Sequence, residues 1–152
     1  MDGELPLAGA CRCGRLGIEV GTVPVMTWAC HCRGCQRMSA SAFSLTATVA
    51  AEAFRVVRGE AVKGGARGPE IDHFFCGDCM TWVFTRPVAM PGFVNVRPTM
   101  LEDSRWSRPF AETMTAEKLP WATTGAWHSY EGFPAMEDFE RLVVEFANSG
   151  RD

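Results

Sequence analysis

The stretch IDHFFCGDCMTWVFT, residues 71–85, decides the fold. Residues 71–75 and 81–85 are rich in β-branched and aromatic side chains, which is typical of short strands. The C-x-x-C motif between them, from Cys76 to Cys79, allows a turn to direct two thiolates at one metal ion, and Gly77 permits tight backbone geometry there. The stretch therefore predicts two strands joined by a metal-binding turn.

Five more cysteines stand in two further motifs. In Cys11-Arg12-Cys13, an extended backbone would direct both sulfurs to the same side, because residues two apart face the same way. Cys30-His31-Cys32-Arg33-Gly34-Cys35 gathers three cysteines, so one strand end and a turn can present three sulfurs to one ion. Water or substrate would fill the fourth position, as in catalytic zinc sites. The seven cysteines thus predict two zinc ions, one in a closed site and one in an open site.

Spacing alone leaves two partitions of the cysteines open. In the first, the motif at 11–13 joins the motif at 76–79 as a closed structural site, and Cys30, Cys32 and Cys35 form the open site. In the second, Cys30 and Cys32 pair with the motif at 76–79 instead. Both partitions satisfy the tetrahedral preference of structural zinc.

The histidines are the other candidate ligands. His31 lies between two cysteines, so on an extended backbone its ring should face away from the ion that they bind. His73 lies in a predicted strand beside Phe74 and Phe75, where a hydrogen-bonded core histidine is the commoner outcome. His128 is a further candidate. We assign none of the three as a ligand.

Short β-rich segments separated by Gly and Pro predict a mainly antiparallel β domain. A short helix is expected at 33–39, directly after the second cysteine motif, and residues 64–69 predict a loop. Near the C-terminus, Pro134 suits a first helical turn, and the residues that follow predict an amphipathic helix packed on the sheet. Its apolar positions are Met136, Phe139, Leu142, Val143 and Phe146. The expected strands are 16–20, 43–49, 54–57, 71–75, 81–85 and 93–96.

The chain has 152 residues, which suits one domain, and no linker or repeat divides residues 1–152. The formal net charge is -3 and the basic residues are dispersed, which argues against nucleic acid or an anionic membrane as a partner. No stretch approaches the ~18 apolar residues of a spanning helix, and the N-terminus lacks a signal-peptide pattern. These features predict a cytoplasmic protein, in which clustered cysteines indicate metal binding more than disulfides. They do not predict the oligomeric state.

The cysteine motifs and several segments around them resemble the glutathione-dependent formaldehyde-activating enzyme family, which includes centromere protein V. The resemblance rests first on Gly9-Ala10-Cys11-Arg12-Cys13-Gly14, on residues 30–37 and on Phe75-Cys76-Gly77-Asp78-Cys79. It extends over nearly the whole chain, since further segments follow in the family's order: Ser41-Ala42-Phe43, Arg58-Gly59-Glu60, Leu101-Glu102-Asp103 and Leu119-Pro120-Trp121.

The resemblance implies several coiled antiparallel sheets and two zinc ions. It implies a structural zinc at the positions that match Cys11, Cys13, Cys76 and Cys79, and a catalytic zinc at those that match Cys30, Cys32 and Cys35. It also implies carbon-sulfur bond formation, in which the glutathione thiol adds to formaldehyde, or the reverse lyase reaction. Arg33 and Arg37 flank the second motif and are candidates to bind a glutathione carboxylate.

Two positions depart from the family pattern. The family commonly has Gly directly after its C-x-x-C motif, where this chain has Met80. A Gly also often follows the Ser or Thr after the second motif, where this chain has Ala40. Both departures are expected to alter local turns.

Three functional hypotheses follow from the sequence. The first is a zinc-dependent enzyme that acts on the thiol adduct of a small aldehyde. The second is a binding module in which both zinc ions are structural and a histidine closes the second site. The third is a thiol redox protein that uses Cys32 and Cys35, although no βαβ pattern surrounds this pair as it would in a thioredoxin-like site.

Overall fold

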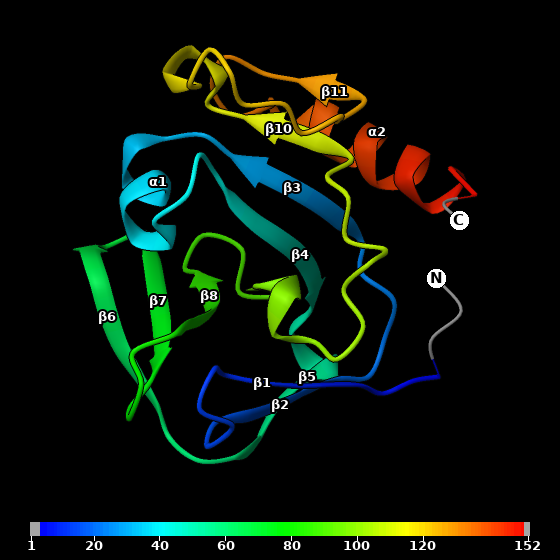
Figure 1. The fold of residues 1–152 in the computed structure, drawn as a ribbon. Helices are drawn as coiled ribbons and strands as arrows, with labels where there is room; N and C mark the ends of the chain where they lie inside the picture. The colour runs from blue at the N-terminus through cyan, green and yellow to red at the C-terminus, as the bar shows by residue number, and fades with distance from the viewer. Residues whose placement is uncertain (1–3, 151–152) are drawn as a thin grey trace.

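The computed structural model describes residues 4–150 and contains two β-sheets within that range (Figure 1). The smaller sheet has the order β1-β2-β5, with β1 at Leu7–Ala10, β2 at Gly17–Val20 and β5 at Phe54–Arg58. The larger sheet has the order β11-β10-β3-β4-β9-β8-β7-β6. Its strands are β3 Met26–Cys30, β4 Ser44–Ala50, β6 Ala61–Gly68, β7 Ile71–Cys76, β8 Trp82–Pro87, β9 Phe93–Val96, β10 Ala111–Thr113 and β11 His128–Ser129.

Two α-helices and three short 3-10 helices accompany the sheets in the described part of the chain. The helix α1 spans Arg33–Ser39, and α2 spans Met136–Ala147. The 3-10 helices are η1 Ala51–Ala53, η2 Pro98–Met100 and η3 Thr115–Glu117. In Figure 1, α2, β10 and β11 lie together at one end of the molecule, and β1, β2 and β5 lie at the other. Among the described helices, none is long and apolar enough to cross a membrane.

The main hydrophobic core joins the two sheets. Ile18 on β2, Val83 on β8 and Val94 on β9 are fully buried in one cluster. The rings of Phe54 on β5 and Phe84 on β8 lie 4.7 Å apart, so the two sheets also meet through aromatic contact. A second cluster packs Leu142 of α2 against Met26 and Phe110, which fixes the C-terminal helix on the large sheet.

The predicted fold class is confirmed: the protein is mainly β with a short helix after the second cysteine motif and a C-terminal helix. The helix at 33–39 and the strand at 93–96 have the predicted bounds. Pairing is antiparallel except at one edge, where β10 pairs in parallel with both β3 and β11. The C-terminal helix begins at Met136 after its N-cap Ala135, so Pro134 precedes the first turn.

The loop predicted at 64–69 is wrong, because β6 continues to Gly68 and pairs with β7. The register of this pair shifts between Gly64 and Gly68. Glycines in a strand often mark such an irregular ladder, since they tolerate a bulge and a close backbone approach. A Cβ at Gly64 would lie 3.0 Å from the ring of Phe75, which shows that the close approach exists here.

The two positions that depart from the family pattern both adopt left-handed backbone conformations. Ala40 is the C-cap of α1 with φ 48° and ψ 43°, and Met80 follows the C-x-x-C turn with φ 57°. The left-handed conformation costs a residue with a Cβ about 1–2 kcal/mol, which glycine avoids. This chain therefore makes both turns with residues that carry a Cβ, at the expense of backbone strain.

Replacing Ala40 with glycine is expected to raise the free energy of unfolding by about 1 kcal/mol, because the strain relieved exceeds the extra entropy of the unfolded glycine. Urea denaturation measures this as a higher midpoint with an unchanged slope. Ala147→Gly is the control: Ala147 is the last residue of α2, where glycine relieves no left-handed strain and should lower stability slightly. Equal effects of both substitutions would contradict the strain argument.

Candidate metal centres

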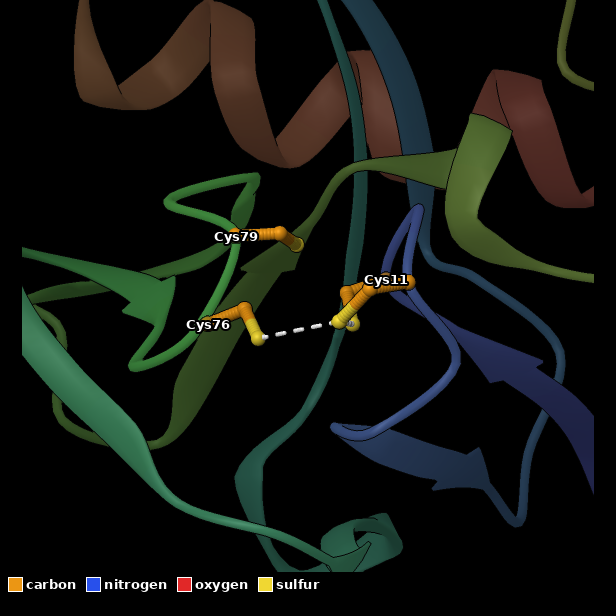
Figure 2. Close-up of side chains that lie close together, drawn as sticks. Cys11, Cys76 and Cys79 are labelled. Atoms are coloured by element: carbon orange, nitrogen blue, oxygen red, sulfur yellow. Dashed lines mark hydrogen bonds between the residues drawn. The ribbon is translucent and has the colours of Figure 1, made fainter.

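The structure gathers Cys11, Cys13, Cys76 and Cys79 into a single group, the four-cysteine cluster. Their sulfurs all lie within 4.8 Å of one another. Cys11 and Cys13 come from the turn after β1, Cys76 ends β7, and Cys79 lies in the turn before β8. Figure 2 shows Cys11 facing Cys76 and Cys79 across the two segments. The cluster therefore links the small sheet to the large sheet.

The four-cysteine cluster has the geometry of a tetrahedral zinc site. The Sγ atoms of Cys11 and Cys13 lie 3.5 Å apart, and those of Cys13 and Cys76 lie 3.8 Å apart. A tetrahedron with zinc-sulfur distances of about 2.3 Å has sulfur-sulfur edges of about 3.8 Å. The backbone N–H of Leu16 donates to Cys11 Sγ at 3.3 Å. The cluster thus fits zinc in both donor type and spacing.

Hydrogen bonds favour the thiolate form of Cys79 in this cluster, whereas hydrogen bonds with the neighbouring cysteines raise the pKa of Cys13. The hydroxyl of Thr81 lies 3.1 Å from Cys79 Sγ. Its hydrogen bond, together with one from the Thr81 backbone N–H, lowers the pKa of Cys79 to about 5. Because zinc binds thiolates, a low thiol pKa reduces the competition between protons and metal.

The structure gathers Cys30, Cys32 and Cys35 into a second group, the three-cysteine cluster, with all sulfurs within 4.8 Å of one another. Cys30 ends β3, Cys32 is the N-cap of α1, and Cys35 lies in the first turn of that helix. The Cys32 sulfur accepts a hydrogen bond from the Cys35 backbone N–H at 3.3 Å. Helix capping therefore positions two of the sulfurs, and the end of the neighbouring strand supplies the third.

Without an ion the three sulfurs share protons unequally. The pKa of Cys30 is lowered to about 5, chiefly because the Cys35 thiol donates a hydrogen bond to it. The same hydrogen bond is the main reason that the pKa of Cys35 is raised. A set of thiols in which one is already a thiolate suits a metal that displaces the remaining protons.

No fourth ligand joins the three-cysteine cluster among the residues that the structure describes. His31 is fully buried, and its Nε2 lies 3.1 Å from Glu112 Oε2. Nδ1 of His73 lies 2.9 Å from the Thr85 hydroxyl, and Nε2 of His128 lies 3.0 Å from Glu145. Of the two partitions that spacing left open, the geometry corresponds to the one with four and three cysteines.

Glu112 on β10 is the centre of a buried hydrogen-bond network behind the three-cysteine cluster, which sequence reasoning missed. Its carboxylate, beside the His31 ring, accepts hydrogen bonds from Lys118 Nζ at 2.8 Å, Thr124 Oγ1 at 2.7 Å and Ser129 Oγ at 3.1 Å. Burial opposes ionisation, but these hydrogen bonds hold the pKa of Glu112 at about 2. One glutamate in a three-residue strand carries no sequence motif that would have revealed it.

Replacing Glu112 with glutamine is expected to reduce stability at neutral pH by up to about 3 kcal/mol. Because the folded pKa lies below the ordinary value of 4.5, the carboxylate stabilises the fold fully above pH 4.5. That contribution is lost as the pH falls towards 2. The difference in unfolding free energy between the wild type and Glu112→Gln should therefore shrink across this range. Exposed Glu131 provides the control, since Glu131→Gln should give a small and flat difference.

A cavity of about 310 Å³ adjoins the three-cysteine cluster, and Cys30 and Cys35 form part of its wall. We refer to it simply as the cavity. Arg97 also lines it, with 7% exposure and its guanidinium carbon 4.1 Å from the centre of the Trp82 ring. Burial lowers the pKa of Arg97 to about 10, so it still carries its charge at neutral pH. Sequence reasoning missed Arg97, because it stands in no motif.

Arg33 and Arg37, the predicted glutathione contacts, do not line the cavity. They lie on an open depression of about 440 Å³ on the outer side of α1, together with Gln36, Leu119 and Trp121. The backbone N–H of Arg33 donates to Glu117 Oε2 at 2.7 Å, and the Gln36 side chain donates to the carbonyl of Glu117 at 3.0 Å. These hydrogen bonds fix the cysteine loop against η3.

Comparison with known proteins supports the resemblance drawn from the motifs. The sequence model of the family described as glutathione-dependent formaldehyde-activating enzyme matches residues 6–117. A crystal structure of a Rhodobacter sphaeroides protein is similar with 26% sequence identity and a TM-score of 0.54, covering 63% of this chain and 88% of the other. No curated protein matches the chain significantly. The family match ends before Leu119-Pro120-Trp121 and is thus shorter than the resemblance first indicated.

Proposed function

Because the chain belongs to the glutathione-dependent formaldehyde-activating enzyme family, we propose that it is a zinc-dependent enzyme of the carbon-sulfur lyase type. It joins a thiol such as glutathione to a small aldehyde such as formaldehyde, or reverses that step. The observation that carries the proposal is the three-cysteine cluster. It has no fourth protein ligand among the residues that the structure describes, and it borders a cavity. The reducing cytoplasm is the proposed location, since it keeps thiols free for metal.

In this proposal the four-cysteine cluster holds a structural zinc and the three-cysteine cluster holds the catalytic zinc. A zinc ion with three thiolate ligands and one free position can hold a bound thiol as its thiolate and polarise a carbonyl oxygen. Cys30, Cys32 and Cys35 would fix such an ion at the cavity wall, which Cys30 and Cys35 help to form.

The reaction is balanced without an oxidant or a reductant. The thiolate sulfur forms a bond to the carbonyl carbon, the carbon-oxygen π bond breaks, and the oxygen takes up the proton that the thiol released. Cys30 and Cys35 are half-buried, so a substrate that fills the cavity would displace water from the reacting atoms and strengthen each electrostatic contact with the developing charge on oxygen.

The proposal is tested by NMR exchange spectroscopy on mixtures of glutathione and formaldehyde. The purified protein should accelerate exchange between the free thiol and its hydroxymethyl adduct. Treatment with a chelator should abolish the acceleration, and added zinc should restore it. An exchange rate equal to that of the uncatalysed mixture would contradict the proposed reaction.

A further inference from the structure

The cavity beside the three-cysteine cluster is suited to an apolar organic group, and we propose that it receives the hydrocarbon part of the aldehyde. The preferred substrate is then the thiol adduct of an aromatic or branched-chain aldehyde, and the formaldehyde adduct is a poor substitute. This inference rests on the proposed function and names the substrate class for the same site.

The size and wall of the cavity are the first argument. Its volume of about 310 Å³ far exceeds the needs of formaldehyde, which is little larger than a water molecule of about 30 Å³. Apolar atoms make up most of the exposed surface of the wall, and Trp28, Trp82, Phe139 and Met136 are among the residues that contribute them. Such a surface binds hydrocarbon because burial of apolar area is favourable.

The charges around the cavity are the second argument. Arg97 is the only permanently charged side chain among the described residues of the wall, and no carboxylate lines it. Glutathione carries two carboxylates and an ammonium group, so inside the cavity its ammonium would be buried without a partner at high cost. The apolar part of the adduct therefore fits the cavity better than the tripeptide does.

Arg97 supplies the third argument. Its Nη2 donates to the backbone carbonyl of Asn95 at 3.3 Å, whereas its buried Nε has no acceptor in the described part of the chain. A buried donor without an acceptor is costly, so a water molecule or a bound ligand is its expected partner. The carbonyl oxygen of an aldehyde gains negative charge as sulfur adds to its carbon, and it can accept this hydrogen bond.

The fourth argument is that part of the cavity belongs to this chain and not to the matched family region. The family match ends at Glu117. Phe133, Pro134, Met136 and Phe139 follow that region, and all four line the cavity. The ring of Phe139 stacks on Trp28 at 5.9 Å, so the C-terminal segment is packed directly on the strand that ends in Cys30. The substrate class is therefore set partly by a segment that the family pattern does not describe.

The test compares two aldehydes with glutathione as the common thiol. Exchange of the phenylacetaldehyde adduct, followed by NMR, should have a kcat/KM at least roughly tenfold above that of the formaldehyde adduct. A gain of this size is expected when a substrate fills a hydrophobic pocket. Equal or better turnover of formaldehyde would overturn the inference and leave the proposed function standing. Failure to accelerate either exchange would overturn both.

Two matched variants distinguish an effect on the cavity from a general effect of a new charge on α2. Met136 and Val144 are both 62% exposed on α2, but only Met136 lines the cavity. Met136→Glu places a carboxylate at the cavity wall and should lower kcat/KM for phenylacetaldehyde several-fold more than kcat/KM for formaldehyde. Val144→Glu should change neither value. Equal losses with both aldehydes in Met136→Glu would contradict a specificity role.

Binding provides a measure that does not depend on turnover. The unreactive alcohol 2-phenylethanol should change tryptophan fluorescence as it fills the cavity, because Trp28 and Trp82 form its wall. Met136→Glu should weaken this binding several-fold, and Val144→Glu should not. No saturable fluorescence change with the wild-type protein would overturn the inference.

Discussion

Replacing Cys13 with serine is expected to remove one zinc ion and most of the folding free energy. Structural zinc contributes on the order of 10 kcal/mol to small domains, which is comparable to the 5–15 kcal/mol that stabilises a typical domain. Cys13 is the best position for this test because it is exposed, so the exchange of sulfur for oxygen leaves no cavity in the core. The loss would therefore report the ion and not packing.

The physical reason is the position of the four-cysteine cluster between the two sheets. It joins the turn after β1 to the turn between β7 and β8, which are separated by more than sixty residues. Chemical denaturation measures the loss of unfolding free energy, and metal analysis of the same samples measures the loss of zinc. Arg12→Ala, at the exposed residue between the two cysteines, is the control and should keep both ions. A Cys13→Ser protein with native stability would show that the core between the sheets suffices without the ion.

Replacing Cys32 with serine is expected to abolish catalysis and leave the fold largely intact. Serine caps helices well, so the variant keeps an acceptor for the Cys35 backbone N–H that Cys32 now caps. It removes one of only three ligands, and activity should fall by roughly a thousandfold, since metal catalysis supplies several kcal/mol. The melting temperature should fall by only a few degrees, because the four-cysteine cluster keeps its ion.

Comparison of this variant with Cys32→Ala separates the enzyme from the binding module. Alanine also removes the helix cap, at an added cost of about 1 kcal/mol. In an open catalytic site both variants lose the second zinc and stay folded. In a module whose second zinc is structural, Cys32→Ser would unfold much as Cys13→Ser does. That result would contradict the enzyme reading.

The sequence predicted those features that depend on local chemistry. Cysteine spacing left two partitions open, and the family resemblance implied the one that the structure shows. The local pattern of apolar residues predicted six strands, each within two residues of its observed bounds. The helix at 33–39 followed from its position after the cysteine motif, where Cys32 is the N-cap. The strands and the helix follow from residues close together in the chain, whereas the four-cysteine cluster joins two local motifs more than sixty residues apart.

Features that depend on long-range pairing were not predictable. Strand β10 has three residues and exists only because it pairs in parallel with β3, more than eighty residues earlier. The contact of Glu112 with His31 and the placement of Arg97 against Trp82 likewise need the assembled sheet. The glycines in β6 were misread because a bulged strand and a loop have the same local composition.

X-ray absorption at the zinc edge of freshly purified protein tests the central claim most directly. The account predicts two zinc ions per chain, one with four sulfur ligands and one with three sulfurs and one lighter atom. The averaged spectrum should then show about three and a half sulfurs per zinc at about 2.3 Å. One zinc per chain, or four sulfurs around every zinc, would contradict the open site on which the proposed chemistry depends.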